Sequence, residues 1–198
     1  MSYDVFSALL LFAFVSSITP GPNNIMLLAS GVNFGFRRTI PHMLGIGAGF
    51  VVLLLAVGLG LGAVLTAFPA LHTALKIAGG AYLLYLAWRV ATSRTLAREG
   101  GEAARPMRFS EAAAFQWVNP KGWTMALTGI TAYAPGQSLW AVLVVSGAFL
   151  VVNSVSGSLW VLIGQQIRRF LTDPRRLVLF NWTMAALLVA TLIPVLIV

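Results

Sequence analysis

The chain contains no cysteine among its 198 residues, and only 9% of its residues are charged. Without thiols there is no disulfide framework, no thiolate nucleophile and no thiolate metal site. Acidic residues are also scarce, with five Asp and Glu in all, and none lies in the middle of an apolar stretch. Because a divalent cation prefers several charged oxygen ligands, this scarcity counts against a metal carrier. We therefore expect no metal site and no cofactor.

Apolar residues fill most of the chain, at 59% of the composition and a mean hydropathy of +0.88. A membrane-spanning helix needs roughly 20 consecutive apolar residues. Such stretches cover about 4–31, 41–66, 69–91, 111–134, 138–163 and 177–197. The pattern predicts an all-α membrane protein in which six transmembrane helices form a single domain over residues 1–198. No catalytic set of side chains lies within the spans, so an enzyme is disfavoured.

The arginines are concentrated in alternate predicted loops. They are Arg37 and Arg38 in loop one, Arg94, Arg98, Arg105 and Arg108 in loop three, and Arg168, Arg169, Arg175 and Arg176 in loop five. Basic loops stay on the cytoplasmic side of a membrane, so the pattern predicts that both termini lie outside the cytoplasm. The formal charge of +8 is then an orientation signal, and no nucleic-acid partner is expected.

A polar linker at about 92–110 divides the chain into two parts, with repeat one at about 1–91 and repeat two at about 111–198. Three predicted spans precede the linker and three follow it, so the two parts enter the membrane from opposite sides. Inverted repeats of this kind are typical of secondary transporters. We expect the same architecture here.

Proline interrupts the first span of each repeat. The first interruption contains Thr19, Pro20, Gly21, Pro22, Asn23 and Asn24, and the second contains Asn119, Pro120 and Lys121. Proline removes an amide donor and clashes with the preceding turn, so both helices should break. Each break lies about 13 Å from the predicted cytoplasmic end at the rise of an α-helix. The two breaks are expected to face each other near the midplane.

Two facing breaks offer charges of both signs to a ligand. Each second half-helix begins with free amides and the positive end of its dipole, whereas each first half-helix ends in free carbonyls. An α-amino acid zwitterion matches this pair, with Lys121 as a candidate for its carboxylate. Asn153 is a further candidate for the cavity wall, or it makes an ordinary hydrogen bond between helices. The alternative for both breaks is a packing kink without a ligand. Separately, Lys121 would lie in a cytoplasmic vestibule if the fourth span began later in the sequence.

Two further features concern packing and titration. Gly45 and Gly49 are four residues apart in the second span and permit close helix approach. Packing within the chain is favoured over the alternative of a homodimer face. His42 is predicted to lie at a membrane boundary.

Three short motifs together resemble one known family. They are Thr19 to Asn24, Gly35-Phe36-Arg37 and Asn119-Pro120-Lys121, and they look like the LysE-type amino-acid exporters. The homoserine/threonine-resistance branch of that family, with its cysteine and O-acetylserine exporters, is the most similar. The resemblance implies a secondary active exporter in the bacterial inner membrane, with protons as the coupling ion. Its cargo would be small neutral amino acids or derivatives, of the cysteine/O-acetylserine, threonine/homoserine or leucine type. A passive small-solute channel or facilitator and an exporter of lysine or arginine are the alternatives.

Overall fold

The computed structural model describes residues 1–93, 105–136, 138–171 and 173–193, without the side chains of Thr66 and His72. Within these ranges every regular element is helical. The elements are α1 Tyr3–Ile18, α2 Pro22–Phe34, α3 Phe36–Ala56, the π-helical η1 Val57–Leu61, α4 Gly62–Ala67, α5 Pro69–Ala91, α6 Phe109–Phe115, α7 Pro120–Tyr133, α8 Leu139–Arg168 and α9 Pro174–Ala190. Most of the predicted linker, with Arg94 and Arg98, lies outside the described residues.

The surface is apolar and the interior carries polar side chains, as expected for a protein surrounded by lipid. Leu59 and Trp140 are 79% and 73% exposed, whereas Gln116 and Asn181 are fully buried. The stretches Phe36–Leu65 and Leu139–Arg168 are long and apolar enough to cross a membrane, and the bent pair α1 and α2 makes a third if it is one span. The chain is therefore an all-α membrane protein.

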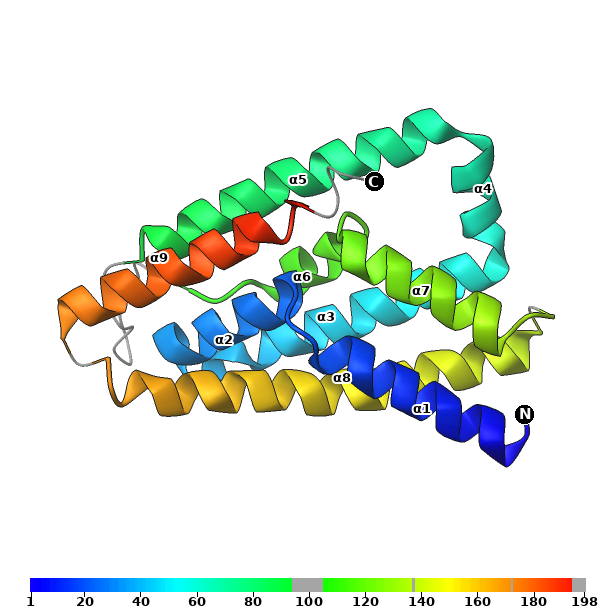
Figure 1. Cartoon of the computed structure of the whole chain (residues 1–198), viewed down its shortest axis with the longest axis horizontal. Coiled ribbons are helices and arrows are strands. Elements are labelled where there is room, and N and C mark those ends of the chain that lie inside the picture. The colour runs from blue at the N-terminus through cyan, green and yellow to red at the C-terminus, as the bar shows by residue number, and fades with distance from the viewer. Residues whose placement is uncertain (94–104, 137, 172, 194–198) are drawn as a thin grey trace.

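The two broken helices run in opposite directions along the molecule (Figure 1). The α1–α2 pair starts at the end that carries the N-terminus, whereas the α6–α7 pair starts nearer the opposite end and finishes beside that terminus. Helices α5 and α9 pack against each other along one side. Two hydrophobic cores divide the interior, one containing Leu27, Leu83 and Phe115 and the other containing Phe50 and Phe149. The breaks lie where these cores meet.

Glycines set how closely the helices approach. A Cβ on Gly31 of α2 would collide with the Val161 backbone of α8, and a Cβ on Gly45 or Gly49 of α3 would collide with the backbone of α6. Small residues at such contacts let helix backbones touch in a membrane protein. Gly45 and Gly49 thus serve packing within the chain, the interpretation that the sequence favoured.

The second predicted span is not the continuous helix that its apolar sequence suggested. Helix α3 passes into the π-helical η1, where Gly60 has a φ of 105°. An L side chain resists this left-handed conformation, whereas glycine adopts it freely. The chain kinks there before α4, which the sequence did not predict, but the predicted span at 41–66 still falls within the apolar stretch Phe36–Leu65 that is long enough to cross a membrane.

Candidate functional site

The first break separates α1 from α2 by a bend of 57°. The last helical bond of α1 runs from the Thr19 N–H to the Val15 carbonyl at 3.2 Å. Pro20 then has no N–H to continue the ladder, and Pro22 occupies the first position of α2. Proline suits that position because its fixed φ is helical and its missing donor would have no partner there. The bend therefore follows directly from the local sequence.

The second break separates α6 from α7 at Gln116–Asn119. Three successive bonds of the tighter i to i+3 type end α6, the last from the Val118 N–H to the Phe115 carbonyl at 3.1 Å. Asn119 adopts an extended conformation, and Pro120 starts α7. Both interruptions thus end in the same way, with a proline that begins a new helix.

The amino ends of α2 and α7 are both without a side-chain cap. Gly21 precedes α2 and offers no side chain, and Asn119 precedes α7 without capping it. The N–H groups at the first turn of a helix have no partner within the helix and carry the positive end of its dipole. Each break therefore provides amides suited to an anionic group.

A pair of amide side chains joins the two breaks. Asn23 donates to Gln116 Oε1 at 2.9 Å, and Gln116 Nε2 donates back to Asn23 Oδ1 at 3.1 Å. Gln116 also donates to the Ala112 carbonyl and is fully buried. This reciprocal bond ties the start of α2 to the end of α6.

Lys121 makes the second link between the breaks. Its Nζ donates to the Thr19 carbonyl at 2.7 Å and to Thr19 Oγ1 at 2.9 Å, and the Pro20 carbonyl lies 3.5 Å away. The lysine side chain crosses directly over Gly21, where a Cβ would lie 2.7 Å from Lys121 Cδ. An ammonium from the second break thus occupies the carbonyls that end the first half-helix.

The remaining carbonyls at the end of α1 also have donors. Asn24 Nδ2 donates to the Ser17 carbonyl at 2.7 Å and to the Thr19 carbonyl at 2.8 Å. Ser156 of α8 donates to the Ser17 carbonyl at 3.0 Å. The Ser17 and Thr19 carbonyls are therefore both satisfied by side chains of this chain.

A cavity of about 40 Å³ lies between the breaks. It has room for water but is well below the roughly 300 Å³ of an ordinary ligand pocket. Its polar side chains come from Ser16, Ser17, Asn23, Asn24, Gln116, Asn119, Lys121 and Asn153. Ser17 Oγ and Asn119 Oδ1 are buried there without a hydrogen-bond partner, and buried polar atoms of this kind call for a ligand or water.

Lys121 also lines a larger cavity on the other side of the breaks. This cavity has a volume of about 590 Å³ and includes Pro20, Pro22 and Pro120 in its wall. Among the sequence-predicted site residues, Thr19 touches neither cavity wall, but it holds Lys121 through its carbonyl and hydroxyl. The structure therefore gathers all the predicted residues around Lys121 and the small cavity.

Three contributors were missed by sequence reasoning. Gln116 stands three residues before Asn119, and its position within the second interruption was the available signal. Ser17 belongs to the first interruption, and Ser156 follows Asn153 along the predicted cavity wall, but neither was named as a binding residue. Their role depends on α8 lying beside the first break, which only the packed structure supplies.

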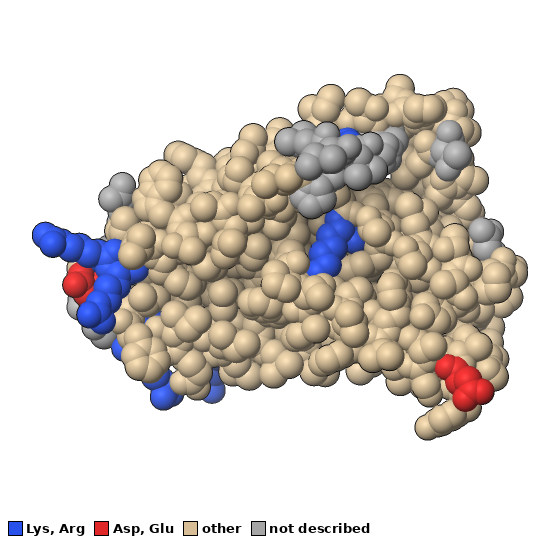
Figure 2. All heavy atoms as spheres, in the orientation of Figure 1, with Lys and Arg blue, Asp and Glu red and all other residues tan. Residues whose placement is uncertain are grey.

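The cationic side chains on the surface are unevenly distributed along the molecule. Figure 2 shows most of the visible Lys and Arg gathered at one end of the molecule, with a separate cationic patch midway along the face. The basic end contains the junction of α8 and α9 (Figure 1), where Arg168, Arg169, Arg175 and Arg176 lie. The cationic patch midway along the face is thus separate from the arginine-rich end.

Comparisons with known proteins agree with these features. Residues 14–193 match the family described as LysE type translocator. The chain is 34% identical over 175 residues to proteins named cysteine/O-acetylserine efflux protein from Escherichia coli strain K12 and from Shigella flexneri, covering 85% of this chain and 87% of each relative. No solved structure matches the chain. The chain therefore belongs to the LysE type translocator family.

Proposed function

We propose that the protein exports a small neutral amino acid or a derivative, of the cysteine/O-acetylserine type, from a site between the two breaks. In this proposal six spans form two inverted repeats in the bacterial inner membrane, with both termini outside the cytoplasm and protons as the coupling ion. The family and the named relatives support the class of cargo. The geometry of the breaks supports the site.

The contact between Lys121 and Thr19 is the observation that carries this proposal. The half-buried Lys121 ammonium there donates to the carbonyl and the hydroxyl of the exposed Thr19 at 2.7 and 2.9 Å, between the two breaks. The α-ammonium of an amino acid carries the same charge and the same three donors. Lys121 therefore marks the position where the substrate ammonium binds.

The transport step follows from an exchange of ammonium groups. When the substrate ammonium takes the Thr19 carbonyl, Lys121 is released and turns toward the substrate carboxylate, which the uncapped amides of α2 and α7 also face. Each helix-end contact contributes about 0.3–2 kcal/mol. Several weak contacts hold a zwitterion and still allow its release, as a carrier requires.

Two alternatives receive less support from the lining of the site. A cavity of about 40 Å³ between the breaks is too narrow for an open pore, which favours a carrier over a passive facilitator. The described lining of the same cavity includes Lys121 and no carboxylate. A lysine or arginine substrate would bring a second cation to Lys121 without an anion to balance it.

Counterflow in proteoliposomes tests the proposal. Vesicles loaded with unlabelled O-acetyl-L-serine should take up the labelled compound faster than empty vesicles, because one alternating site exchanges both. Lys121→Met should abolish this stimulation, and Lys121→Arg should retain part of it because the charge remains. Thr131→Ala is the matched control on α7, since the Thr131 hydroxyl bonds only within its own helix. Uptake without stimulation would indicate a facilitator, and equal mild losses in both Lys121 variants would leave Lys121 only a packing role.

A further inference from the structure

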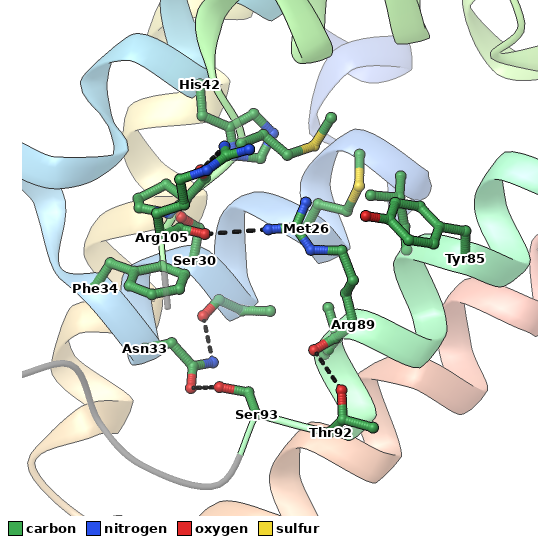
Figure 3. A pocket seen from close by; sticks show the side chains of 15 residues that line it. Met26, Ser30, Asn33, Phe34, His42, Tyr85, Arg89, Thr92, Ser93 and Arg105 are labelled. Atoms are coloured by element: carbon green, nitrogen blue, oxygen red, sulfur yellow. Dashed lines mark hydrogen bonds between the residues drawn. The ribbon is translucent and has the colours of Figure 1, made fainter. Parts of the chain in front are cut away.

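A separate cavity of about 500 Å³ lies between α2, α5 and the segment that leads into α6. Figure 3 shows its lining, with side chains from each of these parts turned toward a common space. The cavity shares no lining residue with the small cavity between the breaks: from α2, Met26, Ser30 and Asn33 line this cavity, whereas Asn23, Asn24 and Leu27 line the other. Its volume falls within the usual range for a ligand site.

The cavity carries one uncompensated positive charge in its described lining. Arg105 is paired with Glu111 through two hydrogen bonds of 2.6 and 2.9 Å. The bond to Glu111 raises the pKa of the Arg105 guanidinium, so this pair stays ionised and neutral overall. Arg89 has no carboxylate partner in the described structure: it reaches the Arg105 carbonyl at 3.4 Å and lies over the Tyr85 ring at 5.9 Å.

His42 provides an independent sign that the cavity holds a ligand. It lines the cavity and is 1% exposed, and neither of its ring nitrogens has a hydrogen-bond partner. The sequence predicted His42 at a membrane boundary, and the structure adds that α3 turns its side chain inward, toward this cavity. A buried imidazole without a partner is costly unless a ligand or water reaches it.

Neutral oxygen atoms line the remaining polar wall. Asn33 Oδ1 accepts from Ser93 at 3.1 Å, and Ser30 shares a hydrogen bond of 2.9 Å with Thr39. Figure 3 shows Asn33 and Ser93 on one side of the space and Arg89 on another. Within the described residues the cavity therefore combines one cation that has no carboxylate partner, Arg89, with several acceptors, the complement of a carboxylate and an ammonium on the same small molecule.

We propose that this cavity is a second binding site, for the carboxylate of the amino acid that the protein exports, with Arg89 as its partner. The inference rests on the proposed function for the identity of the ligand. A guanidinium binds a carboxylate through two parallel hydrogen bonds, and Arg89 is half-buried, where such a pair is stronger than in water. Because the cavity lies toward the ends of α2 and α5 that precede basic loops, it receives the substrate before the breaks do.

Since the chain has no cysteine, one engineered thiol can report on this cavity alone. Thr92→Cys places the thiol in its lining, and the Thr92 hydroxyl bonds only to its own helix, so the change is mild. The labelling rate of the purified protein by a maleimide is measured with increasing O-acetyl-L-serine. Ser7→Cys on α1 is the control thiol outside the cavity, because Ser7 also bonds only within its own helix.

O-acetyl-L-serine should slow the labelling of Thr92→Cys and leave Ser7→Cys unchanged. Adding Arg89→Gln should raise the half-protecting concentration about tenfold to a hundredfold, the loss expected for a hydrogen-bonded charge. Arg89→Lys should fall between the two, because it keeps the charge but loses the paired bonds. The methyl ester of O-acetyl-L-serine, which lacks the carboxylate, should protect poorly even with Arg89 intact.

Adding Lys121→Met to Thr92→Cys separates this site from the proposed transport site. Protection that survives Lys121→Met while counterflow is lost supports two distinct sites. Equal protection by the methyl ester, or protection unchanged in Arg89→Gln, overturns the carboxylate assignment. If Lys121→Met removes the protection of Thr92→Cys, the cavity does not bind substrate independently of the breaks. If O-acetyl-L-serine does not protect the single variant Thr92→Cys, the proposed second site is wrong, whatever the transport assay shows.

Discussion

Replacing Gly21 by alanine should displace Lys121 without straining the backbone. Gly21 has a φ of −175° and a ψ of 175°, an extended conformation that alanine adopts freely. The added Cβ would lie 2.7 Å from Lys121 Cδ and 3.1 Å from Lys121 Nζ. Since these atoms belong to the far part of a flexible side chain, the lysine moves aside at small cost in folding free energy. The ammonium then leaves the Thr19 carbonyl.

The size of the effect follows from the bonds that are lost. Lys121 Nζ makes two short hydrogen bonds, to the Thr19 carbonyl and hydroxyl. Hydrogen bonds of charged groups contribute about 1.5–3 kcal/mol, which corresponds to about a tenfold to hundredfold change in an equilibrium constant. If the lysine must return to Thr19 in each transport cycle, Gly21→Ala should reduce counterflow by about this factor.

Counterflow and thermal denaturation of the same preparations distinguish transport from stability. Gly21→Ala should lose counterflow but keep a thermal denaturation midpoint close to that of the unaltered protein. Gly147→Ala is the control, because a Cβ there meets no atom within 4 Å. Combining Lys121→Met with Gly21→Ala should reduce counterflow no further than Lys121→Met alone does, because both changes remove the same contact between Lys121 and Thr19. Unaltered counterflow in Gly21→Ala, or losses that add in the double variant, would refute the role of this contact.

Two further predictions concern the links and the packing around the breaks. Asn23→Ala and Gln116→Ala should each lower stability by about 1–3 kcal/mol, because the other amide loses its partner, and the double variant should cost little more than either; additive losses in denaturation midpoints would contradict a shared bond. Gly31→Ala should lower the midpoint through overpacking, by about 1–3 kcal/mol or more, since its Cβ collides with the Val161 backbone. Gly147→Ala should leave the midpoint unchanged, and a similar result for Gly31→Ala would show that α2 and α8 separate easily.

The two interruptions could be predicted because their causes are local. Pro20, Pro22 and Pro120 each lack the amide that a continuing helix requires, and the structure ends α1 and α6 just before them. The all-α membrane class followed in the same way from composition. The bend at Gly60 escaped prediction because glycine in an apolar run is compatible with both a helix and a left-handed residue, and only tertiary packing selects between them.

The partners within the site could not be read from the sequence. Asn23 and Gln116 are 93 residues apart, and their bond depends on how α2 and α6 meet. The sequence predicted free carbonyls at the end of the first half-helix and Lys121 near a carboxylate, whereas the structure places Lys121 on those carbonyls. Local chemistry predicts which groups a broken helix exposes, but the neighbours that satisfy them are set by the fold.

The proposed proton coupling requires a side chain that changes its charge during the cycle. The cavity of about 500 Å³ between α2, α5 and the segment that leads into α6 has four ionisable side chains in its described lining: His42, Tyr85, Arg89 and Arg105. Arginine keeps its proton, and of the others only histidine ordinarily titrates between pH 5 and 8. His42 is therefore our candidate for the coupling group, and the charged groups that act on it electrostatically are Glu111, which is paired with Arg105, and Arg89.

His42→Gln keeps a polar side chain of similar reach but cannot take up a proton at these pH values. We expect this variant to retain counterflow, which needs no net proton movement, and to lose accumulation driven by a pH gradient. Lys121→Met should lose both, because it removes the substrate contact itself. Accumulation that persists in His42→Gln would exclude His42 as the proton carrier, and counterflow lost along with accumulation would assign His42 to substrate binding instead.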